Sequence, residues 1–411
     1  MNRFIIYILG LLVSSGACTD APIGQTSVDS TPPPPPADVK VEPLPGGAKI
    51  TYSLPKETDI SYVRGDFRFQ GKDWTVRASA FDNCLTVLGL GAVAPVEMKL
   101  CLVDHSENRS TPINVTFTPD RPPFETVFES MTVEAGWGGV LVKWDNPSGA
   151  DMGITLFAAD TLGQLNEGSI HFSSAKKGEW TFRPYAIVKR RFGVMVTDQW
   201  GNSSGIRSRD ITPKRELKAG AVQRVLPYDN NSEQNGQSFS WMFDGNKVGT
   251  GNISWHSAEN HALSEYRFQT PILFTIDLGS SFTPNRFVLW QGRWAENFLY
   301  SHHNPRLFEL WGTADLQLGQ HPETLDDGSP NPYWLEDWKQ DWTPFGNFEI
   351  AKPSGLPMGQ TSDADVSQAN AGHEFMLSNI SVRYVRFVIN ATWVGNKDNT
   401  ITIHELEFWG Q

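Results

Sequence analysis

The chain has 411 residues, 39% of them hydrophobic and 19% charged, so it is long enough for two to four domains with cores of their own. Its 34 Lys and Arg against 46 Asp and Glu give a net charge of −12 at pH 7, which excludes a nucleic-acid or anionic-membrane partner held by bulk electrostatics. Residues 215–411 alone carry a net −10 and hold 10 of the 15 Trp residues. Composition therefore indicates a globular, multidomain and aromatic-rich protein.

The N-terminal residues are typical of an export signal. One basic residue, Arg3, precedes an apolar run from Phe4 to Val13, which is too short to span a bilayer, and small residues then lead to Cys18. This ending resembles the lipobox of bacterial lipoproteins, in which the cysteine becomes the lipidated N-terminus. An ordinary signal peptide with a chance cysteine is the alternative. We predict a lipoprotein signal over residues 1–17, lipidation at Cys18 and an exported protein.

A proline-rich stretch follows the signal. Residues 18–38 contain five consecutive prolines, which favour an extended polyproline conformation and a semi-rigid tether. Two further cysteines, Cys84 and Cys101, lie beyond it in a compartment that permits disulfides. The sequence leaves open whether they pair on neighbouring strands of one sheet or remain free thiols.

Residues 39–119 and 120–213 contain the same pattern twice. A Gly-Gly pair opens an apolar strand in each copy, and an Asp-x-x-x-Asn-x-Ser stretch begins at Asp104 in the first copy and at Asp198 in the second. The stretches between these marks alternate apolar and polar residues, the period of half-buried strands. The unit resembles an immunoglobulin-like or fibronectin type III sandwich, with the Asp stretch as the turn before its last strand. We expect both copies to be spacers, and a ligand surface on either of them is the alternative.

The C-terminal part does not continue the repeat. Residues 214–235 are polar and predict a linker, and residues 236–411 contain WMFDGN, WHS, FTIDLG, FVLWQGR and a closing ITIHELEFWG, in that order. This succession resembles the discoidin or coagulation-factor C-domain fold, also found in galactose-binding-like carbohydrate-binding modules. The resemblance implies a jelly roll, a fold that binds sugars, lipids or proteins in different members. The whole chain is thus expected to be all-β: two Ig-like or fibronectin-III-like β-sandwiches followed by a discoidin-like β jelly roll.

The order of the domains is similar to that of surface lipoproteins of Bacteroidetes, which are commonly associated with polysaccharide utilisation. The similarity implies capture of a poly- or oligosaccharide at the cell surface, a lipid anchor in the outer membrane, and glycan-uptake proteins as further partners. We expect no enzyme, because the sequence has no Walker loop, Gly-x-Ser-x-Gly elbow or zinc-protease motif. A protein-binding or structural role, and less favoured a glycoside hydrolase, stay open as alternatives.

The resemblance also implies one structural calcium ion. Relatives often hold it where the Asp-Gly-Asn loop meets the terminal Glu, with the oxygen donors that calcium needs. A solvated turn is the alternative. The implied ligands are Asp244, Asn246, Thr250 and Glu405.

Aromatic and planar polar residues make up the candidate sugar site. A sugar presents an apolar face to an aromatic ring and its hydroxyls to guanidinium, amide or imidazole groups. Relatives place such residues in the regions of WHS, of the segment after FVLWQGR and of the loop before the last strand, although the first Trp is also often part of the core. The segment FVLWQGR is predicted as a strand, so Trp290 is expected in the core, whereas Arg293, Trp294, Asn297 and Trp393 are expected to be exposed. The implied ligand-binding residues are Trp255, His256, Arg293, Trp294, Asn297 and Trp393.

Three Trp residues follow at a spacing of four, Trp334, Trp338 and Trp342. On a helix their rings would share one face, whereas in a loop each ring would be a platform for a ligand. Two interpretations stay open: a Trp stripe packed on the jelly roll, or an aromatic insertion that adds specificity, for which Trp338 is the candidate ligand-binding residue.

Overall fold

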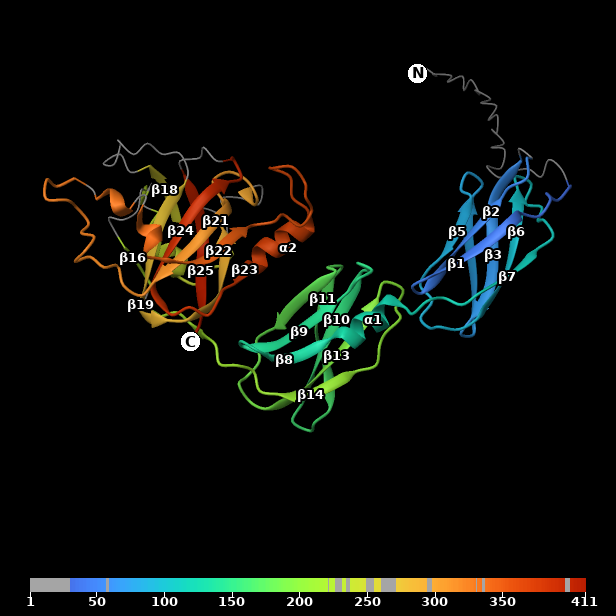
Figure 1. Ribbon diagram of the computed structural model, residues 1–411, viewed down its shortest axis with the longest axis horizontal. Helices are drawn as coiled ribbons and strands as arrows, with labels where there is room; N and C mark the ends of the chain where they lie inside the picture. Colours follow the sequence, from blue (N-terminus) through green and yellow to red (C-terminus); the bar gives the residue numbers. More distant parts are fainter. Residues whose placement is uncertain are drawn as a thin grey trace, which may run out of the picture. The chain divides into compact units, whose positions relative to one another are not determined.

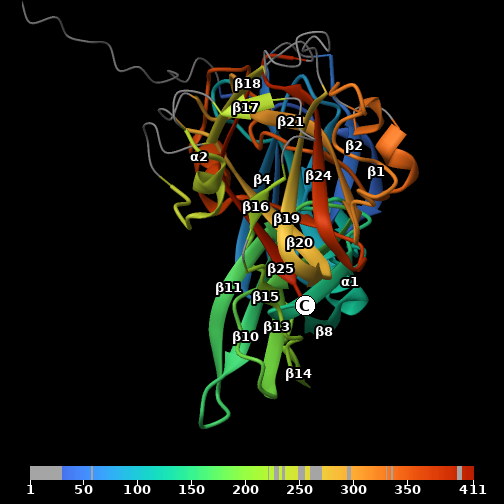
Figure 2. The same ribbon diagram turned by 90° about the vertical axis from the view of Figure 1, so that its left-hand side faces the viewer.

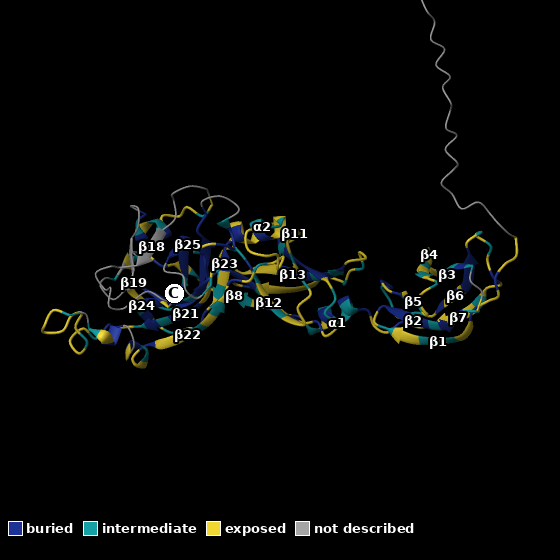
Figure 3. Cartoon of the chain, turned by 90° about the horizontal axis from the view of Figure 1, so that it is seen from above, coloured by how far each residue is buried: buried dark blue, intermediate teal, exposed yellow. Residues whose placement is uncertain are grey.

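The chain forms three antiparallel β-sandwiches in sequence order, which confirms the all-β prediction (Figure 1). Buried residues line the central strands, whereas residues 318–329 in the loop after β21 are mostly exposed (Figure 3). No helix among the described residues is long and apolar enough to cross a membrane. The predicted signal peptide and Cys18 lie outside the residues that the structure describes. The computed structural model describes residues 30–56, 59–220, 222–225, 231–233, 237–248, 255–259, 271–293, 298–329, 331–334, 337–395 and 400–411.

The first sandwich packs a sheet of order β1-β2-β5 on a sheet of order β4-β3-β6-β7, and one apolar cluster fills the space between them. Cys84 lies on β5 and Cys101 on β6, so they belong to different sheets and both are free thiols. The disulfide between neighbouring strands is therefore not formed. The strands are β1 (Ala37–Leu44), β2 (Gly47–Ser53), β3 (Ile60–Phe69), β4 (Lys72–Ser79), β5 (Cys84–Val87), β6 (Val96–Asp104) and β7 (Ile113–Phe117).

The second sandwich repeats this topology with sheets of order β12-β9-β8 and β11-β10-β13-β14. Strands β10 and β11 run side by side and are joined by a projecting loop (Figure 2). A short helix, α1, precedes the first strand and starts with a proline, whose fixed φ suits that position. The elements are α1 (Pro123–Ser130), β8 (Thr132–Gly136), β9 (Gly139–Asp145), β10 (Met152–Ala159), β11 (Leu165–Ser173), β12 (Lys177–Phe182), β13 (Arg190–Asp198) and β14 (Arg207–Ile211).

The two repeated motifs form the same turns in both copies. Gly46 and Gly138 have φ of 65° and 63°, a left-handed conformation that residues with a Cβ rarely adopt. The Oδ1 atoms of Asp104 and Asp198 each accept bonds from the N–H groups two and four residues on. Their Oδ2 atoms each accept a bond of 2.9 Å from the amide of the Asn four residues on. These bonds close the turn before the last strand, as the sequence predicts.

The third sandwich is the C-terminal jelly roll. One sheet has the order β17-β18-β25-β20-β23, with β15 also paired to β25, and the other has the order β16-β19-β24-β21-β22. Phenylalanine rings dominate the core between them; Phe274 and Phe387, for example, stack at a centroid distance of 4.7 Å. The strands are β15 (Leu217–Lys218), β16 (Gln223–Arg224), β17 (Asn231–Glu233), β18 (Trp255–Glu259), β19 (Ile272–Phe282), β20 (Pro284–Gln291), β21 (Pro305–Thr313), β22 (Thr343–Glu349), β23 (His373–Met376), β24 (Val382–Thr392) and β25 (Ile401–Gly410).

Helices in the jelly roll are short. Helix α2 (Asp363–Ala371) starts with a capping box in which Ser362 and Asp365 bond each other's backbone N–H groups. The remaining turns are 3-10 helices: η1 (Phe239–Phe243), η4 (Pro332–Trp334) and η5 (Asp337–Gln340).

Candidate functional site

Two segments that carry predicted ligand residues meet at the start of β25, around Thr402. In the β18–β25 pairing, His256 lies opposite Thr402. Gly292, which precedes Arg293, packs so closely on Thr402 that a Cβ at this glycine would clash with its side chain. The backbone N–H of Thr402 donates to the carbonyl of His303 at 3.0 Å. The fold therefore gathers the WHS strand and the segment after FVLWQGR at one end of the jelly roll.

One buried amide organises the loops at this end. Asn304 is 2% exposed, and its Nδ2 donates to the carbonyls of Gly292 at 3.0 Å and Phe298 at 2.9 Å. The carbonyl of Asn304 accepts the backbone N–H of Trp393 at 3.2 Å. The loop that begins near Arg293 and the loop before the last strand are thus held by the same residue.

Arg293 is anchored inside the protein, which corrects the expectation of an exposed group. It is 8% exposed, and its Nη2 donates to Oδ1 of Asn370 at 2.7 Å. The carbonyl of the same Asn370 accepts Nε1–H of Trp290 at 3.1 Å. Trp290 is itself 4% exposed, so it is part of the packed structure, as expected for a residue in a strand. The end of α2 therefore fixes the guanidinium in place.

Trp393 is half-buried, so its ring is not the exposed platform that the sequence suggested. Its ring meets that of Tyr300 edge to face at a centroid distance of 5.6 Å, and the guanidinium carbon of Arg306 lies 5.1 Å from its centroid. Trp294 and Asn297 lie outside the described residues. For Trp255 and His256 the structure describes the backbone of β18 and not the side chains.

The spaced Trp residues pack around a buried cation. Arg386 of β24 is 0% exposed, and its guanidinium carbon lies 4.7 Å from the ring centroid of Trp338 and 5.9 Å from those of Trp334 and Trp342. Trp338 is 1% exposed and is not available to stack on a sugar. A desolvated guanidinium is stabilised by aromatic faces, which explains why the insertion folds inward. Of the two interpretations of these Trp residues, the structure therefore has the stripe packed on the jelly roll.

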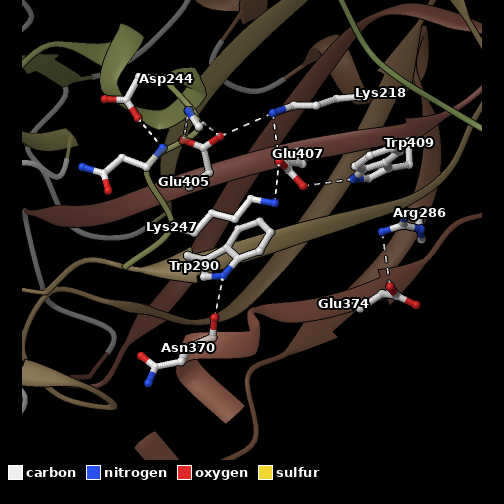
Figure 4. A network of polar contacts seen from close by, with 12 residues as sticks. Lys218, Asp244, Lys247, Arg286, Trp290, Asn370, Glu374, Glu405, Glu407 and Trp409 are labelled. Atoms are coloured by element: carbon white, nitrogen blue, oxygen red, sulfur yellow. Dashed lines mark hydrogen bonds and ion pairs between the residues drawn. The ribbon is translucent and has the colours of Figure 1, made fainter. Parts of the chain in front are cut away.

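Glu405, a predicted calcium ligand, is buried against the Asp-Gly-Asn loop (Figure 4). Both of its oxygens lie 3.2 Å from the backbone N–H of Gly245, and Oε1 lies 3.6 Å from Nζ of Lys218. Burial raises the pKa of Glu405 to about 7, outweighing Lys218 and the Gly245 N–H. The register between β20 and β25 shifts just after the pair Trp290 and Glu405, so a β-bulge sets where this carboxylate points.

The described part of the loop does not form a calcium cage. Oδ1 of Asp244 accepts the N–H of Asn246 at 2.8 Å, and both residues are exposed. Thr250 lies outside the described residues, among which there is no group of three His, Cys, Asp or Glu that would hold a metal. An N–H group and an ammonium already face Glu405, where a cation would need open carboxylate oxygens. The groups described around Glu405 therefore do not fit the calcium ion that the resemblance implies, and its binding remains untested.

The neighbouring carboxylate, Glu407, is also held by protein donors. Nζ atoms of Lys218 and Lys247 each lie 2.9 Å from its Oε1, and Nε1–H of Trp409 donates to its Oε2 at 3.2 Å (Figure 4). The same Lys247 ammonium lies 4.7 Å from the ring centroid of Trp290. Sequence reasoning missed this network, because nothing in the spacing of the two lysines points to a shared acid.

Comparison with known proteins gives several similarities in fold. A SusE-like protein is 25% identical with a TM-score of 0.39, and the match covers 71% of this chain and 99% of that chain. A family 32 carbohydrate-binding module of a family 31 glycoside hydrolase from Clostridium perfringens is 14% identical with a TM-score of 0.31, over 48% of this chain and 95% of its own. A segment of two fibronectin type III domains from chicken tenascin is 13% identical with a TM-score of 0.20, over 43% and 99%.

Neither the family models nor the curated proteins assign a function to this chain. No curated protein matches the sequence. Three family models match, and each is described as a domain of unknown function, over residues 33–119, 120–220 and 250–410.

Proposed function

We propose that the C-terminal jelly roll binds a neutral poly- or oligosaccharide and that the protein is a non-catalytic glycan-binding lipoprotein of the outer cell surface. The observation that carries this proposal is the convergence on Thr402 and Asn304 of the segments with His256, Arg293 and Trp393. Segments distant in sequence are held together at one end of a rigid sheet, which is how binding residues are positioned on such scaffolds.

The chemistry of these residues suits a sugar. The guanidinium of Arg293 is held by Asn370, and the sequence that follows it carries a Trp and an amide, Trp294 and Asn297, whose chemistry suits a sugar. Aromatic rings stack on the apolar face of a pyranose. The net charge of −10 over residues 215–411 disfavours a heavily sulfated glycan.

The proposal includes attachment to the membrane through Cys18 and the proline-rich tether of residues 18–38. A semi-rigid tether holds the sandwiches away from the lipid surface. Many copies on one surface would raise the overall avidity of weak individual sites, so that captured glycan is available to uptake proteins in the same membrane.

The absence of catalysis is part of the proposal. A glycosidase needs two carboxylates that flank the bond to be cleaved. In the described part of the jelly roll, the buried carboxylates Glu405 and Glu407 are instead engaged by Lys218, Lys247 and the Gly245 N–H. A third buried carboxylate, Asp365, is engaged by Ser354 and Ser362.

The test is glycan binding by the purified full chain, measured by affinity electrophoresis and isothermal titration. The panel holds neutral galactan, mannan, glucan and arabinoxylan, with chondroitin sulfate as the anionic comparison. We expect binding to a neutral polysaccharide, at least a tenfold loss with Trp294→Ala, and no loss with Leu325→Ala, whose side chain is 42% exposed in the insertion after β21.

Three outcomes would overturn the proposal. Failure to bind any glycan, with an intact circular dichroism spectrum, would move the function to a protein partner. Binding unchanged by Trp294→Ala and by Asn297→Ala would remove the site from this end of the jelly roll. Release of reducing ends from the bound polysaccharide would show that the protein is an enzyme.

A further inference from the structure

An open apolar groove lies on the second sandwich, on the outer face of the sheet β11-β10-β13-β14. It has a volume of about 650 Å³. Two rows of residues cross the sheet there: Gly153 lies between Phe172 and Thr197, and Thr155 lies between Ile170 and Met195. These six residues are among the thirteen that line the groove.

The groove exposes apolar side chains to solvent. Phe172 is 76% exposed and Ile170 is 44% exposed, although both are large and apolar. The Phe172 ring lies over Gly153, where an added Cβ would come within 3.2 Å of its Cε1. The glycine therefore makes room for the ring, and the exposure costs free energy that a covering ligand would recover.

The first sandwich provides an internal comparison, because it has the same topology. The residue before the repeated Asp lies opposite Tyr62 in the first sandwich and opposite Gly153 in the second. Two residues further along the strand, Arg64 corresponds to Thr155. The remaining corresponding pairs are Ser79 with Phe172, Arg77 with Ile170 and Cys101 with Met195.

The corresponding face of the first sandwich covers itself. The guanidinium carbon of Arg77 lies 5.0 Å from the ring centroid of Tyr62, and the Tyr62 hydroxyl donates to Glu107 at 2.9 Å. Arg64 donates to Asp66 at 2.8 Å on the same face. The open groove is therefore a property of the second copy and not of the fold.

The lining of the groove restricts the ligand. Asp151, Glu167 and Asp198 contribute carboxylates, and no Lys or Arg is among the residues that line it. This excludes phosphorylated, sulfated and other anionic ligands. Thirteen residues line the groove, fewer than the 20–30 per side of a stable protein interface, and its volume lies within the range of about 300–1,000 Å³ that is typical of ligand pockets. The groove fits a small ligand.

We propose that the groove is a second binding site for a neutral saccharide, an inference that rests on the proposed function for the class of ligand. The Phe172 ring takes the apolar face of a pyranose. The carboxylates of Asp151 and Glu167, both exposed, and the hydroxyl of Thr197 accept and donate bonds to the sugar hydroxyls at its edge.

The test counts the sites on the full chain. Hexasaccharides from the neutral polysaccharide bound in the panel above are titrated calorimetrically into the full chain, Phe172→Ala, Glu167→Gln, Trp294→Ala and the double variant Phe172→Ala with Trp294→Ala. The matched control is Phe81→Ala, which removes a ring that is 97% exposed on the first sandwich. The melting temperatures of Phe172→Ala and Phe81→Ala are expected to be unchanged because both rings are exposed.

We expect two sites per chain, one after Phe172→Ala or Trp294→Ala, none in the double variant and two in the control. Glu167→Gln is expected to weaken the groove site at least threefold. One site per chain that Phe172→Ala leaves intact overturns the inference while the jelly-roll site stands. Two sites that Trp294→Ala leaves intact, with one lost in Phe172→Ala, support the inference and overturn the jelly-roll site. No binding of neutral saccharide overturns both.

Discussion

Gln291 fixes the protonation state of His373. Oε1 of Gln291 accepts the backbone N–H of Tyr300 at 2.6 Å, which leaves its Nε2 facing Nε2 of His373 at 2.9 Å. An amide nitrogen donates and does not accept, so the ring nitrogen must be the acceptor and the ring is neutral, with its proton on Nδ1. His373 is 6% exposed, and this burial lowers its pKa to about 4.

The His373 ring should therefore favour unfolding of the jelly roll in mild acid, and the raised pKa of Glu405 opposes this, because the folded state binds the Glu405 proton first. The pKa of His373 is near 6.5 in the unfolded chain and about 4 in the folded protein, so the unfolded state binds the proton first. The contribution is fully present above pH 6.5 and is lost as the pH falls towards 4, by about 3 kcal/mol at most. Thermal unfolding of the full chain between pH 4.5 and 7.5 measures it.

Two variants separate His373 from other acid effects. His373→Gln should be more stable at pH 4.5 relative to pH 7.5 than the unaltered chain is, by about 2–3 kcal/mol, because its side chain no longer titrates while the contribution of Glu405 remains. His105→Gln changes an exposed histidine of the first sandwich and should leave the profile as it is. An unchanged slope in His373→Gln would show that another group is responsible.

Asp365 is expected to protect the fold at still lower pH. Burial raises the pKa of its carboxyl, but bonds from the Ser354 hydroxyl, from the Ser354 N–H and from the Ser362 N–H outweigh it and lower the pKa to about 2. Its stabilising contribution is present above pH 4 and is lost as the pH falls through 2, about 2 kcal/mol in all.

Asp365→Asn tests this directly. The variant places an amide where three donors converge, and we expect a loss of about 2–3 kcal/mol at pH 7. Denaturant unfolding at pH 7 and pH 3 should show the difference between the two proteins shrinking at the lower pH. A difference independent of pH would assign the loss to packing of α2 instead. Asp363→Asn, at an exposed position of the same turn, is the control.

The Trp insertion is expected to act on stability and not on glycan binding. Trp338→Ala removes the ring nearest to the buried Arg386 guanidinium and should cost about 3–5 kcal/mol. Arg386→Lys should cost about 1–3 kcal/mol, because an ammonium does not spread across three rings as a planar guanidinium does. Both are measured by urea unfolding of the full chain.

Glycan binding by the same variants tests the hypothesis from the sequence that Trp338 binds a ligand. At a temperature where Trp338→Ala is folded, its affinity for the neutral polysaccharide should equal that of the unaltered chain. A selective loss of binding with an intact circular dichroism spectrum would restore Trp338 as a ligand residue.

The sequence predicts those features that repeat or alternate locally. The Asp104 and Asp198 turns follow from side chains that bond their own neighbours, so a repeated motif is enough to find them. The stacking of Trp338, in η5, depends on Arg386, which lies 48 residues further on in β24 and carries no local signal. The burial of Arg293 depends in the same way on Asn370.

The groove on the second sandwich also could not be predicted from the sequence. The alternation of Ile170 and Phe172 in β11 predicts a strand with one apolar face. It does not tell which face lies on the core. In the structure both residues face outward, and the core contacts come from the neighbouring strands, so the apolar face of this edge strand became visible only with the sheet order and register.

Calcium should leave the stability of the jelly roll unchanged. The ammonium of Lys218 lies 3.6 Å from Glu405 and the Gly245 N–H bonds the same carboxylate, so a cation would have to displace both. We expect the melting temperature of the full chain to be the same in 5 mM calcium and in excess chelator, whereas a bound ion would stabilise the folded state in proportion to the logarithm of its concentration.

The variants Lys218→Met and Glu405→Gln test whether Lys218 takes the place of a calcium ion beside Glu405. Lys218→Met leaves the Glu405 carboxylate without its cation and should make the melting temperature rise with calcium, because the ion then supplies the missing positive charge. Glu405→Gln should show no calcium dependence, because its amide removes the buried charge. A rise of several degrees in the unaltered chain that disappears in Glu405→Gln would contradict the role given to Lys218 and establish the calcium site that the resemblance implies.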